Sequence, residues 1–252
     1  MKLAAIEVAR IGMGTNRLTN TRQNVAFIKA AVAAGVQLID TAHLYTGGQS
    51  EETIGAALSP MPDNVVVATK GGFNDGSPAV ISAEIDESLR RLRVKSIALY
   101  YLHRVDANFP IETSLGAIKE YVDRGVIRHV GVSQVTVDQI ERARKVVPIA
   151  AVQQQYNLSE RMHDAEVDYC TREGIPFVPF YPLHGAEGRA LEELARRKGG
   201  TTRQIALAWL LKRSPVMLPI PGTSKVAHLE ENVAAAGVEL TADQVAELTA
   251  AA

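Results

Sequence analysis

The sequence has only one cysteine, Cys170, among its 252 residues. A lone cysteine cannot form a disulfide within the chain, so nothing in the sequence demands an oxidising compartment. The N-terminus, MKLAAIEVAR, has an apolar stretch of four residues before Glu7, which is too short for a signal peptide. No window reaches the roughly 20 apolar residues that a membrane-spanning helix needs. We therefore expect a cytoplasmic protein without a membrane segment.

The sequence also lacks an excess of charge of either sign. It has 27 Lys and Arg residues and 28 Asp and Glu residues, for a formal net charge of −1. This balance provides no general attraction to nucleic acid or to an anionic membrane. We expect a monomer whose partner is a small molecule. No metal site is expected either, because the histidines show no paired ligand spacing and His43 stands alone. The others are His103, His129, His163, His184 and His228.

Short apolar runs alternate with longer amphipathic segments along the whole chain. The expected strands are VARIGMG near residue 11, 36–40, 65–70, 97–103, 129–134, 150–156, 176–182 and 216–220. The expected helices cover 21–34, 78–92, 111–123, 136–146, 160–173, 188–198, 201–212 and 224–235, with a last helix from TADQVAELTAAA. Eight β/α pairs in about 250 residues are typical of an α/β fold of the (β/α)8 TIM barrel type. We expect one domain over residues 1–252.

The alternative architecture is an open, doubly wound sheet. Such a sheet normally uses fewer strands and places a phosphate-binding glycine loop after its first strand. The segment GMGTNRL (12–18) lacks the third glycine of that loop. The sequence therefore favours the barrel.

Ionisable residues follow three consecutive expected strands. Asp40, Lys70 and His103 end the strands at 36–40, 65–70 and 97–103, and Tyr45 lies in the loop after Asp40. The C-terminal ends of barrel strands meet at one face, where barrel enzymes carry their catalytic groups. Each residue alone has an ordinary structural explanation, such as a turn former or a lysine that extends to solvent. Their joint occurrence at one face indicates a site.

These four residue types suit the delivery of a proton. A tyrosine has a pKa near 10, which a nearby ammonium lowers by favouring the phenolate. A carboxylate beside the ammonium keeps it charged, and an imidazole can polarise a carbonyl oxygen. We therefore expect Lys70 to lower the pKa of Tyr45, so that Tyr45 protonates an oxygen that becomes negative as hydride reaches the carbon.

At this point the residues match a known family. The stretch DTAHLYTGGQSEETIG (40–55) resembles the aldo-keto reductase signature D-T-A-x-x-Y followed by S-E-x-x-I-G. Further segments occur in the order of the family, namely GMGT, VVVATK, YYLH, RGVIRHVGVS, QQQYNL, FYPL and IPGTSKVAHLEEN. The resemblance implies an NADP-dependent oxidoreductase that reduces aldehydes or ketones to alcohols. It also implies a catalytic tetrad of Asp40, Tyr45, Lys70 and His103.

The resemblance further implies that NADP(H) binds in an extended form without a Rossmann domain. Ser133, Gln134 and Gln153 would hold the nicotinamide carboxamide, and Phe180 would stack on the nicotinamide ring. The other implied cofactor residues are Gly14, Thr15, Asn16 and Asp40 at the nicotinamide end, Tyr181 and Leu183 along the pyrophosphate, Gly222, Thr223 and Ser224 at the last helix, and His228, Glu231 and Asn232 at the adenosine.

Four positions depart from the family pattern. Gln134 replaces the usual Asn, and Thr46 replaces the Gly that often follows the tetrad tyrosine. Gly222 and His228 stand where many members have the Lys and Arg that pair with the 2′-phosphate. We still favour NADP(H) moderately over NAD(H), because Thr223, Ser224 and Lys225 remain near that phosphate.

The segments RVDANFP and HGAEGR, which follow His103 and FYPL, are brief, and the chain ends in a helix. In the family, long loops at these places wall the substrate pocket. The resemblance thus implies a shallow, open pocket with weak discrimination among substrates.

Two other functions remain open at this stage. Lys70 could form a Schiff base, as in aldolases, although Asp40 beside it would keep the lysine protonated. The barrel could also be a sensor that binds the cofactor without turnover, which the complete tetrad disfavours.

Overall fold

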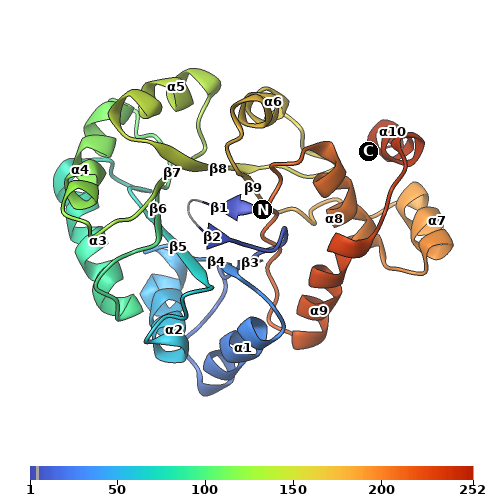
Figure 1. Cartoon of the computed structure of the whole chain (residues 1–252), viewed down its shortest axis with the longest axis horizontal. Coiled ribbons are helices and arrows are strands. Elements are labelled where there is room, and N and C mark those ends of the chain that lie inside the picture. The colour runs from blue at the N-terminus through green and yellow to red at the C-terminus, as the bar shows by residue number, and fades with distance from the viewer. Residues whose placement is uncertain (4–5, 252) are drawn as a thin grey trace.

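The computed structural model describes residues 1–3 and 6–251, so residues 4, 5 and 252 of the expected domain and terminal helix lie outside the described part. Seven parallel strands form one sheet in which each strand pairs with the next along the chain. They are β3 (Met13–Gly14), β4 (Leu38–Asp40), β5 (Val66–Gly71), β6 (Leu99–Leu102), β7 (Val130–Ser133), β8 (Ile149–Gln155) and β9 (Phe177–Phe180). In Figure 1 the helices form an outer ring around these strands, which confirms the predicted barrel.

The helices begin at the polar caps that the sequence provides. Thr21, Ser77, Thr136 and Thr201 each accept a hydrogen bond from the backbone of the first turn. The helices are α1 (Arg22–Ala33), α2 (Gln49–Leu58), α3 (Pro78–Leu92), α4 (Ile111–Asp123), α5 (Val137–Val146), α6 (Asp164–Glu173), α7 (Arg189–Lys198), α8 (Thr202–Arg213), α9 (Val226–Ala234) and α10 (Ala242–Ala251). Helix α2 was not among the predicted helices. Within the described residues, no helix has both the length and the apolar composition to cross a bilayer.

The expected strand at 216–220 is not a regular strand, although it closes the barrel. Pro219 and Pro221 have no N–H, so this segment cannot donate a continuous ladder of hydrogen bonds. It instead bonds at intervals to both neighbouring strands. On one side, the amide N of Leu218 donates to Phe177 O at 2.9 Å, and on the other side Gly12 N donates to Pro219 O at 2.9 Å.

The closure requires a glycine on β3. A Cβ atom on Gly14 would lie 2.9 Å from the carbonyl oxygen of Ile220, which is closer than real Cβ atoms approach. The missing side chain lets the first strand and the closing segment meet through a bridge between Gly14 and Gly222.

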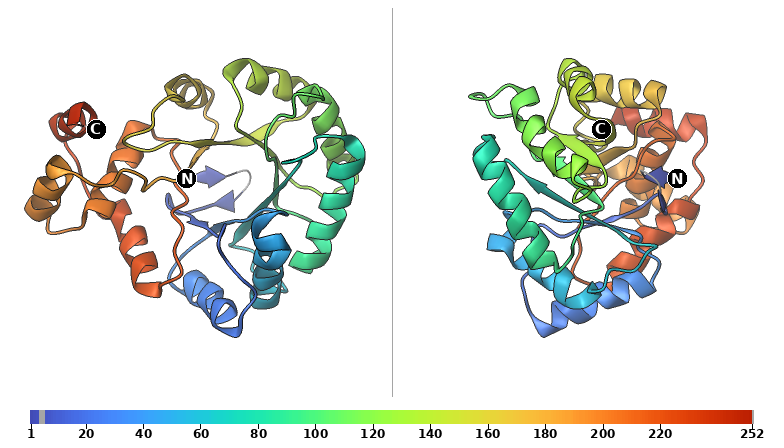
Figure 2. Two further views of the ribbon diagram at one scale, coloured as in Figure 1. Left: turned by 180° about the vertical axis from the view of Figure 1, so that it is seen from behind. Right: turned by 60° about the vertical axis from the view of Figure 1, so that its left-hand side comes forward.

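A short antiparallel hairpin that the sequence did not predict blocks one end of the barrel. Its strands are β1 (Lys2–Leu3) and β2 (Ile6–Glu7), and the left view in Figure 2 shows them inside the ring of helices. Leu3 is fully buried in one cluster with Leu38, Leu99 and Leu218. Because the hairpin covers the end at which the strands begin, a ligand reaches the barrel from the end at which they finish.

Gly55, in the SEETIG part of the family-like motif, allows α2 to touch α3. A Cβ atom on Gly55 would collide with the backbone carbonyl oxygen of Arg91. We expect Gly55→Ala to destabilise the protein by about 1–3 kcal/mol, because two packed backbones must separate. The measurement is the free energy of unfolding in urea.

Gly116→Ala is the matched control, since a Cβ atom there meets nothing within 4 Å. Gly116 lies inside α4, where alanine should be neutral or should stabilise by about 0.5–1 kcal/mol. Similar losses at both positions would show that helix packing does not require Gly55.

Candidate active site

The ends of three neighbouring strands bring the four expected tetrad residues together. Asp40 is the last residue of β4, Lys70 lies near the end of β5, and His103 directly follows β6. Tyr45 begins the short 3-10 helix η1 (Tyr45–Gly48), which follows β4 over the same end of the barrel. These side chains form a single cluster, because consecutive parallel strands place their C-terminal ends side by side.

Lys70 is the centre of this cluster. Its Nζ atom donates to Asp40 Oδ1 at 2.6 Å, to the carbonyl oxygen of Thr41 at 2.7 Å and to the hydroxyl of Tyr45 at 3.3 Å. An ammonium has three N–H donors, so all of them are used. Since Lys70 is also fully buried, its position and direction are determined by these three partners.

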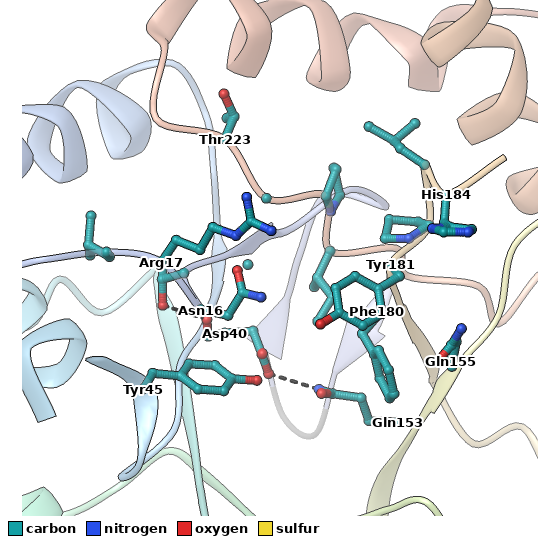
Figure 3. A pocket seen from close by; sticks show the side chains of 18 of the residues that line it. Asn16, Arg17, Asp40, Tyr45, Gln153, Gln155, Phe180, Tyr181, His184 and Thr223 are labelled. Atoms are coloured by element: carbon teal, nitrogen blue, oxygen red, sulfur yellow. Dashed lines mark hydrogen bonds between the residues drawn. The ribbon is translucent and has the colours of Figure 1, made fainter. Parts of the chain in front are cut away.

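Gln153 holds the other oxygen of the Asp40 carboxylate. The side chain extends from β8, and its Nε2 atom donates to Asp40 Oδ2 at 2.8 Å, as the dashed line in Figure 3 marks. Both carboxylate oxygens therefore have a charged or polar donor. This bond uses only the amide nitrogen of Gln153, so Oε1 remains available to a ligand.

The net pKa of Tyr45 lies above its usual value, although Lys70 lowers it as the sequence suggested. Burial raises the pKa of Tyr45 above its usual value, and Lys70 offsets only part of that rise. Lys70 thus acts in the expected direction, but burial has the larger effect, and the sequence does not show how little water reaches the phenol. The phenol is consequently protonated at neutral pH, which is the form that can donate a proton.

Lys70 remains charged in spite of its burial. Burial by itself would lower the pKa of this lysine, but Asp40 and Tyr45 raise it, and the net direction is upward. Burial also raises the pKa of Asp40, against the opposing effects of Lys70 and Gln153. A lysine held as an ammonium with three partners is a poor nucleophile, which counts against the Schiff-base alternative.

His103 is neutral in this site. Burial, together with the charges of Lys70 and Arg104, lowers its pKa to about 2. Its ring packs edge-on against Tyr45 and Phe73, with centroid distances of 5.9 Å and 4.8 Å. The Nδ1 atom is buried and has no hydrogen-bond partner in the described part of the chain. A neutral imidazole can orient a carbonyl but cannot act as the acid.

A pocket of about 890 Å³ extends from these residues across the end of the barrel. Figure 3 shows Tyr45 and Asp40 at one end and Thr223 at the other, with Asn16 and Arg17 between them. The expected cofactor residues that line it are Gly14, Thr15, Asn16, Asp40, Ser133, Gln134, Gln153, Phe180, Tyr181, Leu183, Gly222, Thr223 and Ser224. The pocket therefore connects almost the whole set that the sequence suggested.

Three expected cofactor residues lie on α9 and do not line this pocket. His228 is half-buried there. The Glu231 carboxylate accepts a hydrogen bond from the Thr201 hydroxyl at 2.5 Å, so it ties α9 to the start of α8. Asn232 is 1% exposed, and neither polar atom of its side chain has a partner among the described residues. Lys70 also does not reach the pocket surface, because Tyr45 and Asp40 cover it.

Two departures from the family pattern fall on left-handed backbone. Thr46 has φ 50° and Gln134 has φ 54°, a region that glycine and asparagine tolerate better than other residues. This backbone conformation explains why Gly and Asn are usual at these two positions in the family. Thr46 gains a compensating contact, because its hydroxyl lies 2.7 Å from the carbonyl oxygen of Leu18 in the pocket wall.

The sequence analysis missed several residues that line the pocket. They are Arg17, Leu44, Phe73, Gln155 and Arg203, among others. Phe73 lies two residues beyond β5 and Gln155 is the last residue of β8, so attention to strand ends could have found them. Arg203 had no such signal, because it lies in the first turn of α8, a helix on the outside of the barrel.

The pocket is open where the sequence lacks long loops. Leu44 and Tyr181 line it and remain 37% and 54% exposed. In the described chain, no residue beyond Ser224 contributes to the lining. Helix α10 packs instead near α7 and α8, where the Thr249 hydroxyl accepts a hydrogen bond from Trp209 Nε1 at 2.9 Å. The described residues also contain no group of three or more potential metal ligands.

A second charged cluster supports the loop that carries Tyr45. The imidazole of His43 lies 3.4 Å from the Glu84 carboxylate and 2.8 Å from the Glu87 carboxylate. The backbone carbonyl oxygen of His43 accepts a hydrogen bond from Arg91. The hydrogen bond with Glu84, followed by that with Glu87, raises the pKa of His43 although burial opposes the shift.

This shift predicts a pH dependence of stability. Because the folded pKa is above the unfolded one, His43 stabilises the fold fully below the unfolded value and loses that contribution as pH rises through the folded value. The free energy of unfolding of the wild type, relative to His43→Gln, should therefore fall on going from about pH 6 toward pH 8.

The matched control is His129→Gln. Burial lowers the pKa of His129, so the difference between wild type and this variant should change with the opposite sign. Urea unfolding at several pH values measures both series. A constant difference for His43→Gln would show that the ion pair does not contribute.

Comparison with known proteins agrees with this geometry over the whole chain. The model of the aldo/keto reductase family matches residues 10–188 and 186–252. An uncharacterised oxidoreductase of Schizosaccharomyces pombe is 39% identical over 98% of this chain and 88% of its own length. Pyridoxine 4-dehydrogenase of Escherichia coli is 36% identical over 89% of this chain and 85% of its own.

Solved structures are similar as well. A thermostable aldo-keto reductase, Tm1743, crystallised with the inhibitor epalrestat, superposes with a TM-score of 0.92 at 28% identity, covering 100% of this chain and 99% of that one. An aldo/keto reductase from Klebsiella pneumoniae, in complex with NADP and acetate, has a TM-score of 0.87 at 28% identity, covering 96% and 90%. By motif, fold and sequence match, this chain belongs to the aldo-keto reductase family.

Proposed function

We propose that this protein reduces aldehyde or ketone carbonyls to alcohols with NADPH, and that Tyr45 donates the proton. The observation that carries the proposal is the contact between Tyr45 and Lys70. A protonated phenol lines the pocket, and its oxygen accepts a hydrogen bond from an ammonium at 3.3 Å that is itself held by Asp40. Such an arrangement can release a proton and stabilise the phenolate that remains.

The residues of the pocket suit the cofactor. At the inner end, Gln153 Oε1 and the buried Ser133 are available to the carboxamide of a nicotinamide, and the half-buried Phe180 offers its ring. When bound, NADPH would supply the hydride. The Tyr45 hydroxyl would then protonate the carbonyl oxygen, while neutral His103 donates a hydrogen bond that orients the same oxygen.

The preference for NADPH over NADH is part of the proposal. Thr223 and Ser224 line the far end of the pocket, where their hydroxyls and the backbone before α9 can face a phosphate. The two Klebsiella pneumoniae neighbours were crystallised with NADP and with NADPH.

The substrate end of the pocket favours a broad range of carbonyl substrates. Apolar and aromatic side chains from different loops surround Tyr45, namely Leu44, Phe73 and Tyr181. Since two of these remain well exposed, we propose that the enzyme accepts aldehydes and ketones of several sizes. Pyridoxal belongs in the test panel because of the name of the Escherichia coli relative. The proposal includes a monomer in the cytoplasm, and light scattering would test the oligomeric state.

A cofactor titration and a substrate panel test the proposal together. Binding should change the fluorescence of NADPH, and adding an aldehyde, ketone or pyridoxal should then consume it. A sensor would bind NADPH without turnover on any member of the panel. An aldolase would ignore the cofactor and would form a carbonyl adduct on Lys70 that borohydride traps. Either result would contradict the proposal.

A further inference from the structure

The far end of the pocket lacks the cations expected for a 2′-phosphate. Gly222 has no side chain, while Lys225, the residue before α9, and His228 on α9 both lie outside the lining. A phosphate monoester carries about −1.5 to −2 charges at pH 7, and its selective recognition needs a cation or several donors. The hydroxyls of Thr223 and Ser224 alone supply no charge.

Arg203 supplies a permanent cation to the same pocket. It is the second residue of α8, half-buried, and it lines the same pocket as Thr223 and Ser224. The residues on both sides of it are anchored to α9. Thr201 donates to the Glu231 carboxylate, and Gln204 Nε2 donates to the Glu231 carbonyl oxygen at 3.1 Å. The start of α8 is thus held against α9, the helix that follows Thr223 and Ser224 along the chain.

Within the described residues, the guanidinium of Arg203 forms no hydrogen bond or ion pair. The Oε1 atom of the Glu231 carboxylate already accepts a hydrogen bond from Thr201. Asp40 is the only acidic residue in the lining, and its charge is matched by Lys70. The other permanent cation of the lining, Arg17, lies beside Asn16, nearer to Tyr45 (Figure 3).

We propose that Arg203 recognises the 2′-phosphate of NADPH and so determines the cofactor preference. This inference rests on the proposed function. The planar guanidinium can form two parallel hydrogen bonds to phosphate oxygens, together with the Thr223 and Ser224 hydroxyls. Because arginine stays charged, the preference for NADPH should hold between pH 6 and pH 8.

Calorimetric titration with two nucleotides tests the assignment without turnover. Adenosine 2′,5′-bisphosphate and adenosine 5′-monophosphate differ only in the 2′-phosphate. Arg203→Gln should weaken binding of the bisphosphate about 10–100-fold and should change binding of the monophosphate by less than about twofold. Arg203→Lys, which keeps the charge but loses the fork, should fall between wild type and Arg203→Gln.

Arg196→Gln is the matched control, because it removes the same charge from an exposed position on α7 outside the pocket. It should bind both nucleotides as the wild type does. Thermal unfolding of each variant checks that the fold persists, and the ratio of NADPH to NADH dissociation constants at pH 6 and pH 8 provides an independent readout.

The outcomes separate the two proposals. If the wild type binds neither NADPH nor NADH, the proposed function fails. If the wild type binds NADPH, two results would overturn the role of Arg203. One is an unchanged affinity of Arg203→Gln for the bisphosphate, and the other is an equal loss for both nucleotides, which would place the guanidinium on the adenine or the 5′-phosphate.

Discussion

Replacing Tyr45 with phenylalanine is expected to lower the rate of carbonyl reduction by about 10²–10⁴-fold while the affinity for NADPH stays nearly unchanged. The substitution removes one oxygen atom, the one that accepts from Lys70 Nζ at 3.3 Å. The ring keeps its edge-on contact with His103, so the shape of the pocket is preserved. Only the source of the proton is lost.

Single-turnover reduction, measured beside a fluorescence titration with NADPH, separates the two effects. Tyr169→Phe is a suitable control, because Tyr169 lies on α6, away from the pocket. The substitution removes a hydroxyl that accepts a hydrogen bond from Arg144 Nη1. It should reduce carbonyls at the rate of the wild type. Turnover of Tyr45→Phe near that rate would exclude Tyr45 as the donor.

Lys70→Met should reduce turnover about as strongly and should also move the pH profile. Burial raises the pKa of Tyr45, and Lys70 opposes that rise. Without the ammonium, the phenol becomes still harder to ionise. Oxidation of an alcohol by NADP⁺ needs the phenolate, so the rate of that direction increases as pH rises through the pKa of Tyr45. In Lys70→Met, this increase in the oxidation rate should occur at higher pH than in the wild type.

The structure adds a complication to this experiment. Removing Lys70 leaves Asp40 buried with only Gln153 as a partner, and an unpaired buried charge costs about 3–5 kcal/mol. The double variant Lys70→Met/Asp40→Asn removes both charges and guards against unfolding. A deuterated alcohol first establishes that hydride transfer limits the rate of oxidation. Under that condition, the rate should rise at higher pH in both variants than in the wild type. A modest loss with an unchanged profile would assign Lys70 a structural role.

The tetrad could be predicted because its members come from the most regular part of the fold. Three of its residues end consecutive strands, and a polar residue after a run of apolar ones is visible in any sequence. Parallel pairing then brings these ends together, as the register of Asp40 with Ala68 and of Lys70 with Tyr101 shows. The distance between Lys70 and Tyr45 needed the structure, because it depends on how η1 folds back over the pocket.

Other features were missed because their signals are weak or nonlocal. Helix α2 has Ile54 and Leu58 at helical spacing and two glutamates in its first turn, a signal that could have been used. The N-terminal hairpin has only two residues in each strand, too few for a pattern. Arg203 resembles any exposed helical arginine in sequence, and only the packing of α8 against α9 reveals the pocket beside it.

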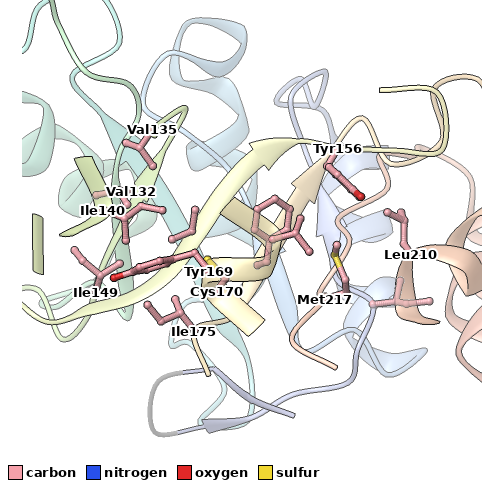
Figure 4. Packing of buried hydrophobic residues seen from close by; sticks show 14 of the residues in the cluster. Val132, Val135, Ile140, Ile149, Tyr156, Tyr169, Cys170, Ile175, Leu210 and Met217 are labelled. Carbon is pink, nitrogen blue, oxygen red and sulfur yellow. The ribbon is translucent and has the colours of Figure 1, made fainter. Parts of the chain in front are cut away.

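By itself, the sequence determined the order of the seven parallel strands, the family, and the residues that meet at the mouth of the barrel. These follow from local periodicity and from strand ends, which each segment encodes on its own. The tertiary structure decided the rest. It closed the barrel through the proline-containing segment around Met217, a buried residue that lies near Leu210 in Figure 4. It also made the net pKa shift of Tyr45 upward in spite of Lys70, because exclusion of water arises from all surrounding elements together and no short stretch of sequence records it.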